Sequence, residues 1–218
     1  MVEKKFLLLD LDGTIINTVL LWRFACKQIL EQDGFYLTDS QIALLPNELH
    51  SVVQYGHRDS NEFVRRVVQY VRENVSTTQL HVGVLEILEL FKSRGLPMAI
   101  VTSSFHITAM EMLEQHCITG YFPVVVGRDD VADGHTKPHR EPFDTALTRL
   151  GGIESKKKVV VTGDQRNDVL GGKNIGAITV AYYPEAHHSV YQSQDVAVWG
   201  ADHVISDFSE LEHIVLRQ

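Results

Sequence analysis

The sequence predicts an α/β protein with a doubly wound parallel sheet and an inserted all-helical domain. Short runs of Val, Ile and Leu alternate with amphipathic helical segments over most of the chain, which is typical of a parallel sheet covered on both faces. Residues 17–81, in contrast, show helical periodicity and no convincing strand pattern. We therefore expect a core formed by residues 1–16 and 82–218, interrupted by a helical insert over residues 17–81.

Composition and charge exclude several classes of partner. The 218 residues are 44% hydrophobic and carry a formal net charge of -8. The longest basic run is Lys156–Lys158, so neither a nucleic-acid backbone nor an anionic membrane is expected as a partner. No apolar stretch approaches the ~20 residues of a membrane span. Asp10 also ends the N-terminal apolar run too early for a signal peptide.

The two cysteines indicate the redox environment of the protein. Cys26 and Cys117 lack the spacing of metal ligands, and two free thiols are typical of a reducing environment. We therefore expect a cytoplasmic protein. As a separate expectation, the protein is a monomer or a homodimer.

The first element is a strand over Phe6–Leu9, a continuous apolar run with the length of a buried strand. The insert begins with a helix from Thr18, in which apolar residues recur at helical spacing until Asp33-Gly34 ends it. A second helix begins at Thr38, and Asp59 is placed to cap a third. These segments account for the insert without any strand.

After the insert, helices and strands alternate to the end of the chain. The predicted helices cover residues 84–94, 107–116, 141–150 and 168–173, with a C-terminal helix from residue 207. The predicted strands cover residues 98–101, 123–127, 158–162 and 177–180, with an edge strand at 204–205. Residues 183–200 carry no assignable pattern, and His187 and His188 within them are expected in a polar loop.

Two carboxylates follow the first predicted strand. Alternate residues of an extended chain point the same way, so Asp10 and Asp12 can face one small volume. Two anions held that close require a neutralising cation, or one of them must be protonated and available as an acid. The alternative is that Asp10–Gly13 is only a polar turn, and the other strand ends must decide.

Further polar groups follow the other predicted strands. Thr102 and Ser103 follow the second, Asp164 and Asp168 follow the fourth, and Lys137 lies between the third and fourth. Ligands of open parallel sheets bind beyond the carboxyl ends of the strands, so these groups are expected at one edge. Oxygen ligands without His or Cys suit magnesium, which completes its shell with phosphate and water. The set therefore predicts metal-assisted phosphoryl transfer.

With these segments the chain resembles the haloacid dehalogenase (HAD) superfamily in its phosphatase branch. Its first motif, Asp-x-Asp-Gly-Thr, matches Asp10–Thr14, and its second, an apolar strand ending in Thr or Ser, matches Ala99–Thr102. The third matches Lys137–Phe143, with Arg140 in place of the usual second proline, and the fourth matches Gly163–Asp168. The helical insert resembles the small cap that this family carries between its first two motifs.

The resemblance implies a catalytic role for each matched residue. Asp10 is expected to be the nucleophile that forms an aspartyl phosphate, with Asp12 as general acid and then general base. Thr102 and Ser103 are expected to bind the phosphoryl group, and Lys137 to lie between the phosphate and Asp10.

The resemblance also implies a magnesium site. Asp10, the backbone carbonyl of Asp12 and Asp164 are expected to hold Mg²⁺, and Asp168 to bind it directly or through water. The expected substrate is a small phosphorylated metabolite, as in the phosphoglycolate phosphatase-like group. Two alternatives stay open: a β-phosphoglucomutase-like mutase, although that group carries a His where this chain has Trp22, and a non-catalytic binding protein on the same fold.

Overall fold

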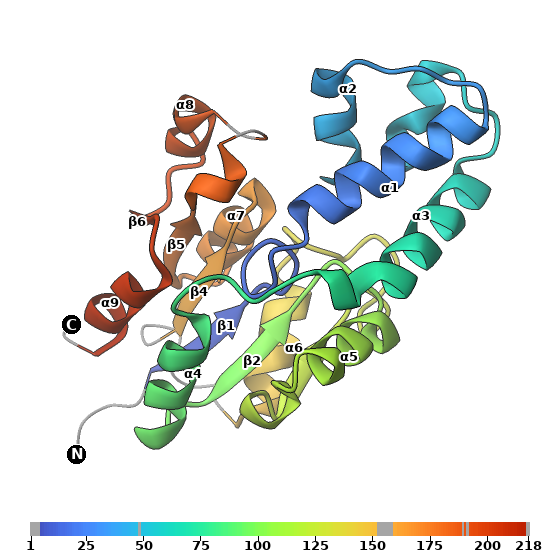
Figure 1. Cartoon of the computed structure of the whole chain (residues 1–218). Helices are drawn as coiled ribbons and strands as arrows, with labels where there is room; N and C mark the ends of the chain where they lie inside the picture. Colours follow the sequence, from blue (N-terminus) through green and yellow to red (C-terminus); the bar gives the residue numbers. More distant parts are fainter. Residues whose placement is uncertain (1–4, 48, 152–158, 189, 191, 217–218) are drawn as a thin grey trace. The chain divides into compact units, whose positions relative to one another are not determined.

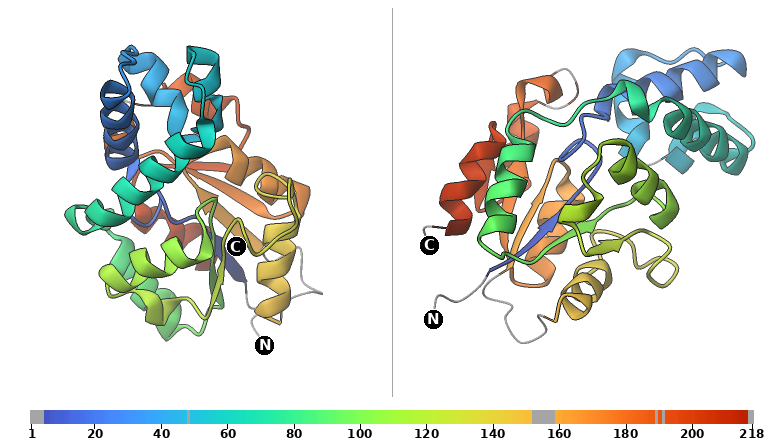
Figure 2. Two further views of the ribbon diagram at one scale, coloured as in Figure 1. Left: turned by 90° about the vertical axis from the view of Figure 1, so that its right-hand side faces the viewer. Right: turned by 60° about the horizontal axis from the view of Figure 1, so that its bottom comes forward.

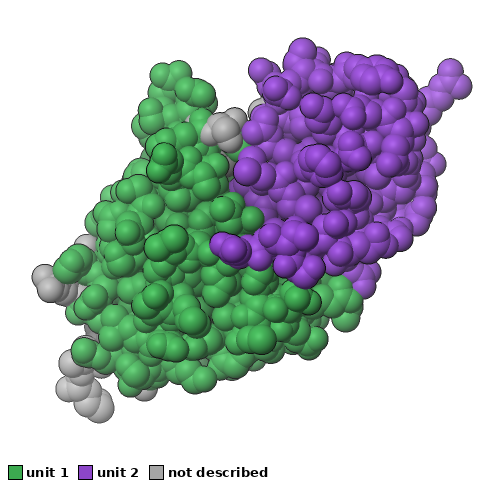
Figure 3. All heavy atoms as spheres, viewed as in Figure 1, with its two compact units in different colours: residues 1–17, 80–218 green, residues 18–79 purple. Residues whose placement is uncertain are grey.

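The computed structural model divides the chain into two compact units, which are coloured separately in Figure 3. Unit 1 comprises Met1–Asn17 and Leu80–Gln218, and unit 2 comprises Thr18–Gln79. The structure describes residues 5–47, 49–151, 159–188, 190 and 192–216.

A parallel sheet forms the centre of unit 1 (Figure 1). Its strands among the described residues are β1 (Phe6–Leu9), β2 (Met98–Val101), β3 (Val124–Val126), β4 (Val159–Gly163), β5 (Ile178–Tyr182) and β6 (His203–Ile205). Their order is β3-β2-β1-β4-β5-β6, and every neighbouring pair is parallel. The strand order reverses at β1, which is where such sheets bind ligands. The predicted doubly wound α/β fold is confirmed.

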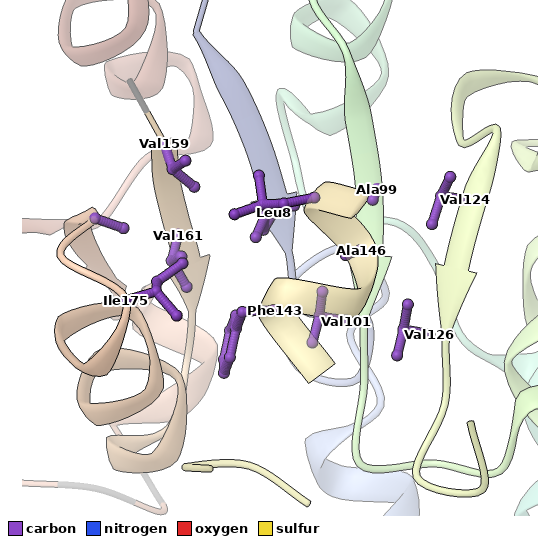
Figure 4. Packing of buried hydrophobic residues seen from close by; sticks show 12 residues of the cluster. Leu8, Ala99, Val101, Val124, Val126, Phe143, Ala146, Val159, Val161 and Ile175 are labelled. Atoms are coloured by element: carbon purple, nitrogen blue, oxygen red, sulfur yellow. The ribbon is translucent and has the colours of Figure 1, made fainter. Parts of the chain in front are cut away.

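One face of the sheet buries a layer of aliphatic side chains that neighbouring strands contribute in register. Leu8 in β1 lies opposite Ala99 in β2 and Val161 in β4. Phe143 and Ala146 of helix α6 (Glu141–Arg149) pack on this layer (Figure 4). The alternate residues of β1 are fully buried as well, so both faces of the strand are covered and its sequence is a continuous apolar run.

Helices lie on both faces of this sheet (Figures 1 and 2). They are α4 (Val84–Ser93), α5 (His106–Gln115), α6 (Glu141–Arg149), α7 (Arg166–Asn174), α8 (Ser193–Ala197) and α9 (Leu211–Leu216). Pro142 stands in the first turn of α6, where a missing backbone N–H breaks no helical hydrogen bond. No helix in the described part of the chain is long and apolar enough to cross a membrane.

Unit 2 is helical throughout its described residues. It contains α1 (Val19–Gln32), α2 (Asp39–Leu44) and α3 (Ser60–Asn74), joined by 3₁₀ turns. The Thr38 hydroxyl accepts a hydrogen bond from the Gln41 N–H at the start of α2, and Asp59 accepts one from the Glu62 N–H at the start of α3. Both caps lie where the sequence predicts helix starts.

Asp33, the residue that ends α1, joins three segments of unit 2. Its carboxylate accepts hydrogen bonds from Arg66 Nη1 at 2.6 and 2.8 Å and contacts His57 Nε2 at 3.0 Å. Burial alone would raise the pKa of Asp33, but the bonds from these two side chains outweigh it and lower that pKa. The interaction connects the end of α1 to α3 within the unit.

The observed elements differ from the predicted ones mainly at their ends. Strand β5 begins at Ile178 and continues to Tyr182, and helix α7 begins two residues earlier than predicted. The start of the fourth strand at Lys158 lies outside the described residues. Residues 183–200, which carry no assignable sequence pattern, contain the 3₁₀ turn Glu185–His187 and helix α8.

Gly171 in α7 offers a test of the packing between α7 and α6. A Cβ atom at Gly171 would lie 2.2 Å from Phe143 Cε2, so Gly171→Ala must displace a buried ring. We expect this overpacking to exceed the helix-propensity gain and to lower the free energy of unfolding by about 1–3 kcal/mol. Urea unfolding followed by circular dichroism measures the change.

Gly120→Ala is the matched control. A Cβ atom there would lie 3.9 Å from the nearest neighbour, Lys92 Nζ, which is an ordinary contact. We expect a change within about 0.5 kcal/mol. Equal effects of the two substitutions would contradict the packing argument.

Candidate active site

The ammonium group of Lys137 lies at the centre of the predicted site. Its Nζ atom is 2.6 Å from Asp10 Oδ1, 2.6 Å from Asp168 Oδ1 and 3.1 Å from the backbone carbonyl of Val101. The side chains of Lys137, Asp10 and Asp168 are each at most 5% exposed. The structure therefore brings together three residues that are separated by up to 158 positions in the sequence.

Asp10 is positioned by the end of the central strand. Its N–H donates to the Thr162 carbonyl at 2.9 Å, which extends the pairing of β1 with β4 by one residue. The chain then turns at Gly13, which has a φ of 80° that only glycine adopts without strain. A Cβ atom at Gly13 would lie 2.4 Å from Asp164 Oδ2, so the turn passes directly against that carboxylate.

Asp164 supplies the feature that best fits a cation. Its Oδ1 atom accepts a hydrogen bond from Thr14 Oγ1 at 3.1 Å, whereas its buried Oδ2 atom has no hydrogen-bond partner among the described residues. Asp10, Asp164 and Asp168 each offer an oxygen atom within 4.8 Å of the others. When all are ionised, the three carboxylates and the Lys137 ammonium carry two net negative charges, which one divalent ion would neutralise.

The electrostatics of these groups follow from burial and mutual repulsion. Burial raises the pKa of Asp164 well above its ordinary value, and the neighbouring carboxylates raise it further. Burial likewise raises the pKa of Asp10, and it raises the pKa of Asp168 to about 6 although Lys137 opposes both shifts. Burial would lower the pKa of Lys137, but Asp10 and Asp168 outweigh it and raise that pKa. Lys137 therefore remains charged at neutral pH.

Asp168 has a different environment from Asp164. Its Oδ1 atom accepts from Lys137, and its Oδ2 atom accepts from the Gln165 N–H at 3.1 Å at the start of α7. A Cβ atom at Gly163 would lie 2.1 Å from Asp168 Cγ. The glycine at the end of β4 therefore allows the Asp168 carboxylate to lie against the backbone of that strand. Because both oxygens accept hydrogen bonds, Asp168 has less capacity left for a metal ion than Asp164 has.

The remaining predicted residues lie at the end of β2 and in the turn after β1. Asp12 is partly buried, and its Oδ2 atom accepts a hydrogen bond from Ser104 Oγ at 2.8 Å. Thr102 is buried and its hydroxyl oxygen accepts from the Ser104 N–H at 3.1 Å. Ser103 is exposed.

Sequence reasoning missed three contacts of this site. Thr14 and Ser104 belong to the polar runs that follow β1 and β2, and their hydroxyls hydrogen-bond the carboxylates of Asp164 and Asp12. His187, expected in a polar loop, is instead fully buried, with Nδ1 3.9 Å from Asp164 Oδ2. The expectation was wrong because the turn containing His187 packs against the rings of His81 and Tyr182, which no local pattern reveals.

Comparison with known proteins gives the family. A family model described as haloacid dehalogenase-like hydrolase matches residues 7–182. The chain is 28% identical to a pyrophosphatase, PpaX, of Halalkalibacterium halodurans, over 98% of this chain and 97% of that protein. It is 30% identical to a phosphoglycolate phosphatase of Neisseria meningitidis, over 78% of this chain and 77% of the other.

A solved structure agrees with this assignment. The crystal structure of a candidate β-phosphoglucomutase from Thermotoga maritima superimposes with a TM-score of 0.72 at 25% identity, covering 97% of this chain and 96% of that one. The family match covers most of the chain and contains every predicted site residue from Asp10 to Asp168. The protein therefore belongs to the haloacid dehalogenase-like hydrolase family.

Proposed function

We propose that the protein is a magnesium-dependent phosphatase that hydrolyses a small phosphorylated metabolite through an aspartyl phosphate on Asp10. One observation carries the proposal. Lys137 binds one oxygen of Asp10. In the same buried group of carboxylates, Asp164 Oδ2 has no hydrogen-bond partner among the described residues. A nucleophile, a cation and a vacant carboxylate oxygen beside each other are the parts that phosphoryl transfer requires.

Asp10 would act as the nucleophile through Oδ2. Its Oδ1 atom accepts from Lys137 at 2.6 Å, whereas Oδ2 accepts a longer hydrogen bond, 3.4 Å, from the Thr14 hydroxyl. In the first step Oδ2 forms a bond to phosphorus and the bond to the leaving oxygen breaks. In the second step water attacks the phosphorus, phosphate departs and the Asp10 carboxylate is restored.

Asp12 would move the proton in both steps. It would protonate the leaving oxygen in the first step and accept the proton of the attacking water in the second. The hydrogen bond from Ser104 Oγ to its Oδ2 atom would fix the orientation of the carboxyl group. Asp12 is also less buried than Asp10, as a group that contacts the leaving part of the substrate should be.

Mg²⁺ would be held by Asp10, Asp164 and the backbone carbonyl of Asp12, with Asp168 contributing through water. When bound, the ion would neutralise the charge of the carboxylates and of the phosphate oxygens. Thr102 and Ser103 would bind the phosphoryl oxygens. The Thr102 oxygen accepts from the Ser104 N–H, which leaves its hydroxyl proton for a phosphate.

The class of substrate has two candidates. The relatives named pyrophosphatase and phosphoglycolate phosphatase favour a phosphoanhydride and a small phosphomonoester, respectively. The match to the pyrophosphatase extends over nearly the whole of both chains, so a phosphoanhydride is the second function to test. A mutase is disfavoured because Trp22 stands where β-phosphoglucomutases carry a histidine. A non-catalytic role is disfavoured because the chain keeps Asp10, Asp12, Lys137 and Asp164.

Unit 2 would serve as the cap that selects the substrate. Its helices are inserted between the first and second motifs, as in the family's small caps. We further propose a cytoplasmic location, which is supported by the two free cysteines, Cys26 and Cys117.

Asp10→Asn tests the nucleophile. The amide cannot form the phosphoenzyme, so we expect kcat for p-nitrophenyl phosphate in Mg²⁺ to fall by on the order of 10³-fold or more, with an unchanged circular dichroism spectrum. Asp133→Asn, which removes the same charge from an exposed loop position, should keep full activity. Full activity of Asp10→Asn would refute the assignment.

Asp12→Asn tests the general acid. We expect kcat/KM to fall by roughly 10²–10⁴-fold for an alkyl phosphate, whose leaving oxygen needs a proton, and much less for an aryl phosphate or pyrophosphate. Steady-state kinetics on the three substrates give the ratios and also rank the two substrate classes. Equal losses on all substrates would assign Asp12 a role other than proton donation.

Asp164→Asn tests the metal site. Because the pKa of Asp164 is raised on folding, its ionisation destabilises the folded protein as the pH rises above about 4. We expect Asp164→Asn to be more stable than the wild type at pH 7 in the absence of metal, and to match the wild type near pH 3. Thermal unfolding in EDTA measures this difference.

The same variant should lose the response to magnesium. We expect Mg²⁺ to raise the midpoint of thermal unfolding of the wild type and not that of Asp164→Asn. Asp133→Asn, which removes a carboxylate from an exposed loop position, is the control and should keep the wild-type response to magnesium. Wild-type magnesium stabilisation in Asp164→Asn would contradict the proposed ligand.

A further inference from the structure

A second group of metal-ligating side chains lies in the segment between β3 and α6. His135, His139 and Glu141 each offer a ligand atom, and these atoms lie within 4.8 Å of one another. None of the three belongs to the proposed catalytic set. We call these residues the His-His-Glu cluster.

Short contacts already hold the cluster together. His135 Nδ1 is 2.5 Å from Glu141 Oε2, within hydrogen-bonding distance. The rings of His135 and His139 are stacked, with centroids 4.1 Å apart and an angle of 19° between their planes. The Glu141 N–H donates to His139 Nδ1 at 3.2 Å, which orients the ring and leaves its Nε2 atom as a ligand.

The cluster is open to solvent and carries the charge that a cation requires. The side chains of His135 and Glu141 are 46% and 34% exposed, and a cavity of about 460 Å³ borders His139 and Glu141. Hydrogen bonds from the Ala132 N–H and from His135 lower the pKa of Glu141, so its carboxylate is ionised at neutral pH. Arg140, which also borders the cavity, is paired with Asp144, so it does not oppose an ion as a free charge.

The donor atoms decide which ions this cluster suits. Two imidazole nitrogens and one carboxylate oxygen match the ligands of Zn²⁺ and other late first-row divalent ions, which bind nitrogen more strongly than Mg²⁺ does. The Asp10, Asp164 and Asp168 group offers only oxygen atoms, which suit Mg²⁺. The two groups therefore differ in ion preference.

We propose that His135, His139 and Glu141 form a binding site for a late first-row divalent ion such as Zn²⁺, separate from the magnesium site. The ion would take one nitrogen from each imidazole and one carboxylate oxygen, with water in the remaining position. Glu141 Oε1 would keep its hydrogen bond from the Ala132 N–H, and the ion would replace the contact between His135 Nδ1 and Glu141 Oε2. The stacked rings would turn apart so that both nitrogens face the ion.

The location of the site gives it a consequence for the catalytic lysine. Lys137 lies between His135 and His139 in the chain, and its ammonium group contacts Asp10 and Asp168. An ion held by both histidines would fix the two ends of the short segment that carries Lys137. Occupation would therefore restrain this segment without contacting the substrate.

Cobalt titration tests the proposal, because Co²⁺ bound by two imidazoles and a carboxylate shows visible d–d absorption. The full-length protein is kept in Mg²⁺ that saturates the oxygen site, Co²⁺ is added, and Zn²⁺ is then used to displace it. We expect one Co²⁺ per chain and loss of the absorption on addition of Zn²⁺. In His135→Gln and in His139→Gln the affinity should fall by at least about tenfold.

Two variants serve as controls. His213→Gln alters an exposed histidine on α9 and should bind Co²⁺ like the wild type. Asp164→Asn should also keep the absorption, because it changes only the oxygen site. The proposal is overturned if the wild type shows no absorption, if both cluster variants bind Co²⁺ as tightly as the wild type, or if Asp164→Asn abolishes binding.

Discussion

The ion pairs of one buried ammonium hold the candidate site together. Lys137 contacts Asp10 at the end of β1 and Asp168 at the start of α7, and it also donates to the end of β2. Removing these charges from water is unfavourable, so each depends on the others for compensation. The sheet supplies the geometry that makes this compensation available, since β1 lies between β2 and β4 and the strands end at one edge.

The excess negative charge beside Lys137 favours a ligand-binding site over a structural ion pair. A structural pair needs one carboxylate, yet this ammonium faces two, and a third belongs to the same group. Asp164 is buried with one oxygen that has no hydrogen-bond partner in the described part of the chain, which is unfavourable in the metal-free protein. Such an arrangement is retained where a ligand relieves it, as expected of a site that binds both a cation and a phosphate.

The sequence predicted most of the fold because strong local patterns coincide with the observed elements. The apolar run at Phe6–Leu9, the cap at Asp59 and the polar groups that follow β1 and β4 all rest on features within a few residues. Element ends were less accurate, as in β5, because tertiary pairing with β6 extends that strand to Tyr182. The local sequence pattern does not predict the pairing of β5 with β6.

The contacts of the site were predicted less completely. The matched motifs identify Asp10, Lys137 and Asp164 as neighbours, but they do not predict that Ser104 orients Asp12. Burial of His187 depends on packing against His81, more than 100 positions away. The proximity of His135 and Glu141 depends on how the loop folds back at the start of α6, which the spacing of the residues does not determine.

The two glycines beside the carboxylates limit how proteins with this arrangement can diverge. At Gly13 and Gly163 the backbone lies so close to Asp164 and Asp168 that even a methyl group would overlap them. Selection for a new substrate therefore has little freedom at these positions, since any larger residue would separate the charged groups. Substitutions that change the substrate are therefore expected in the surrounding segments, where they leave the arrangement of the carboxylates unchanged.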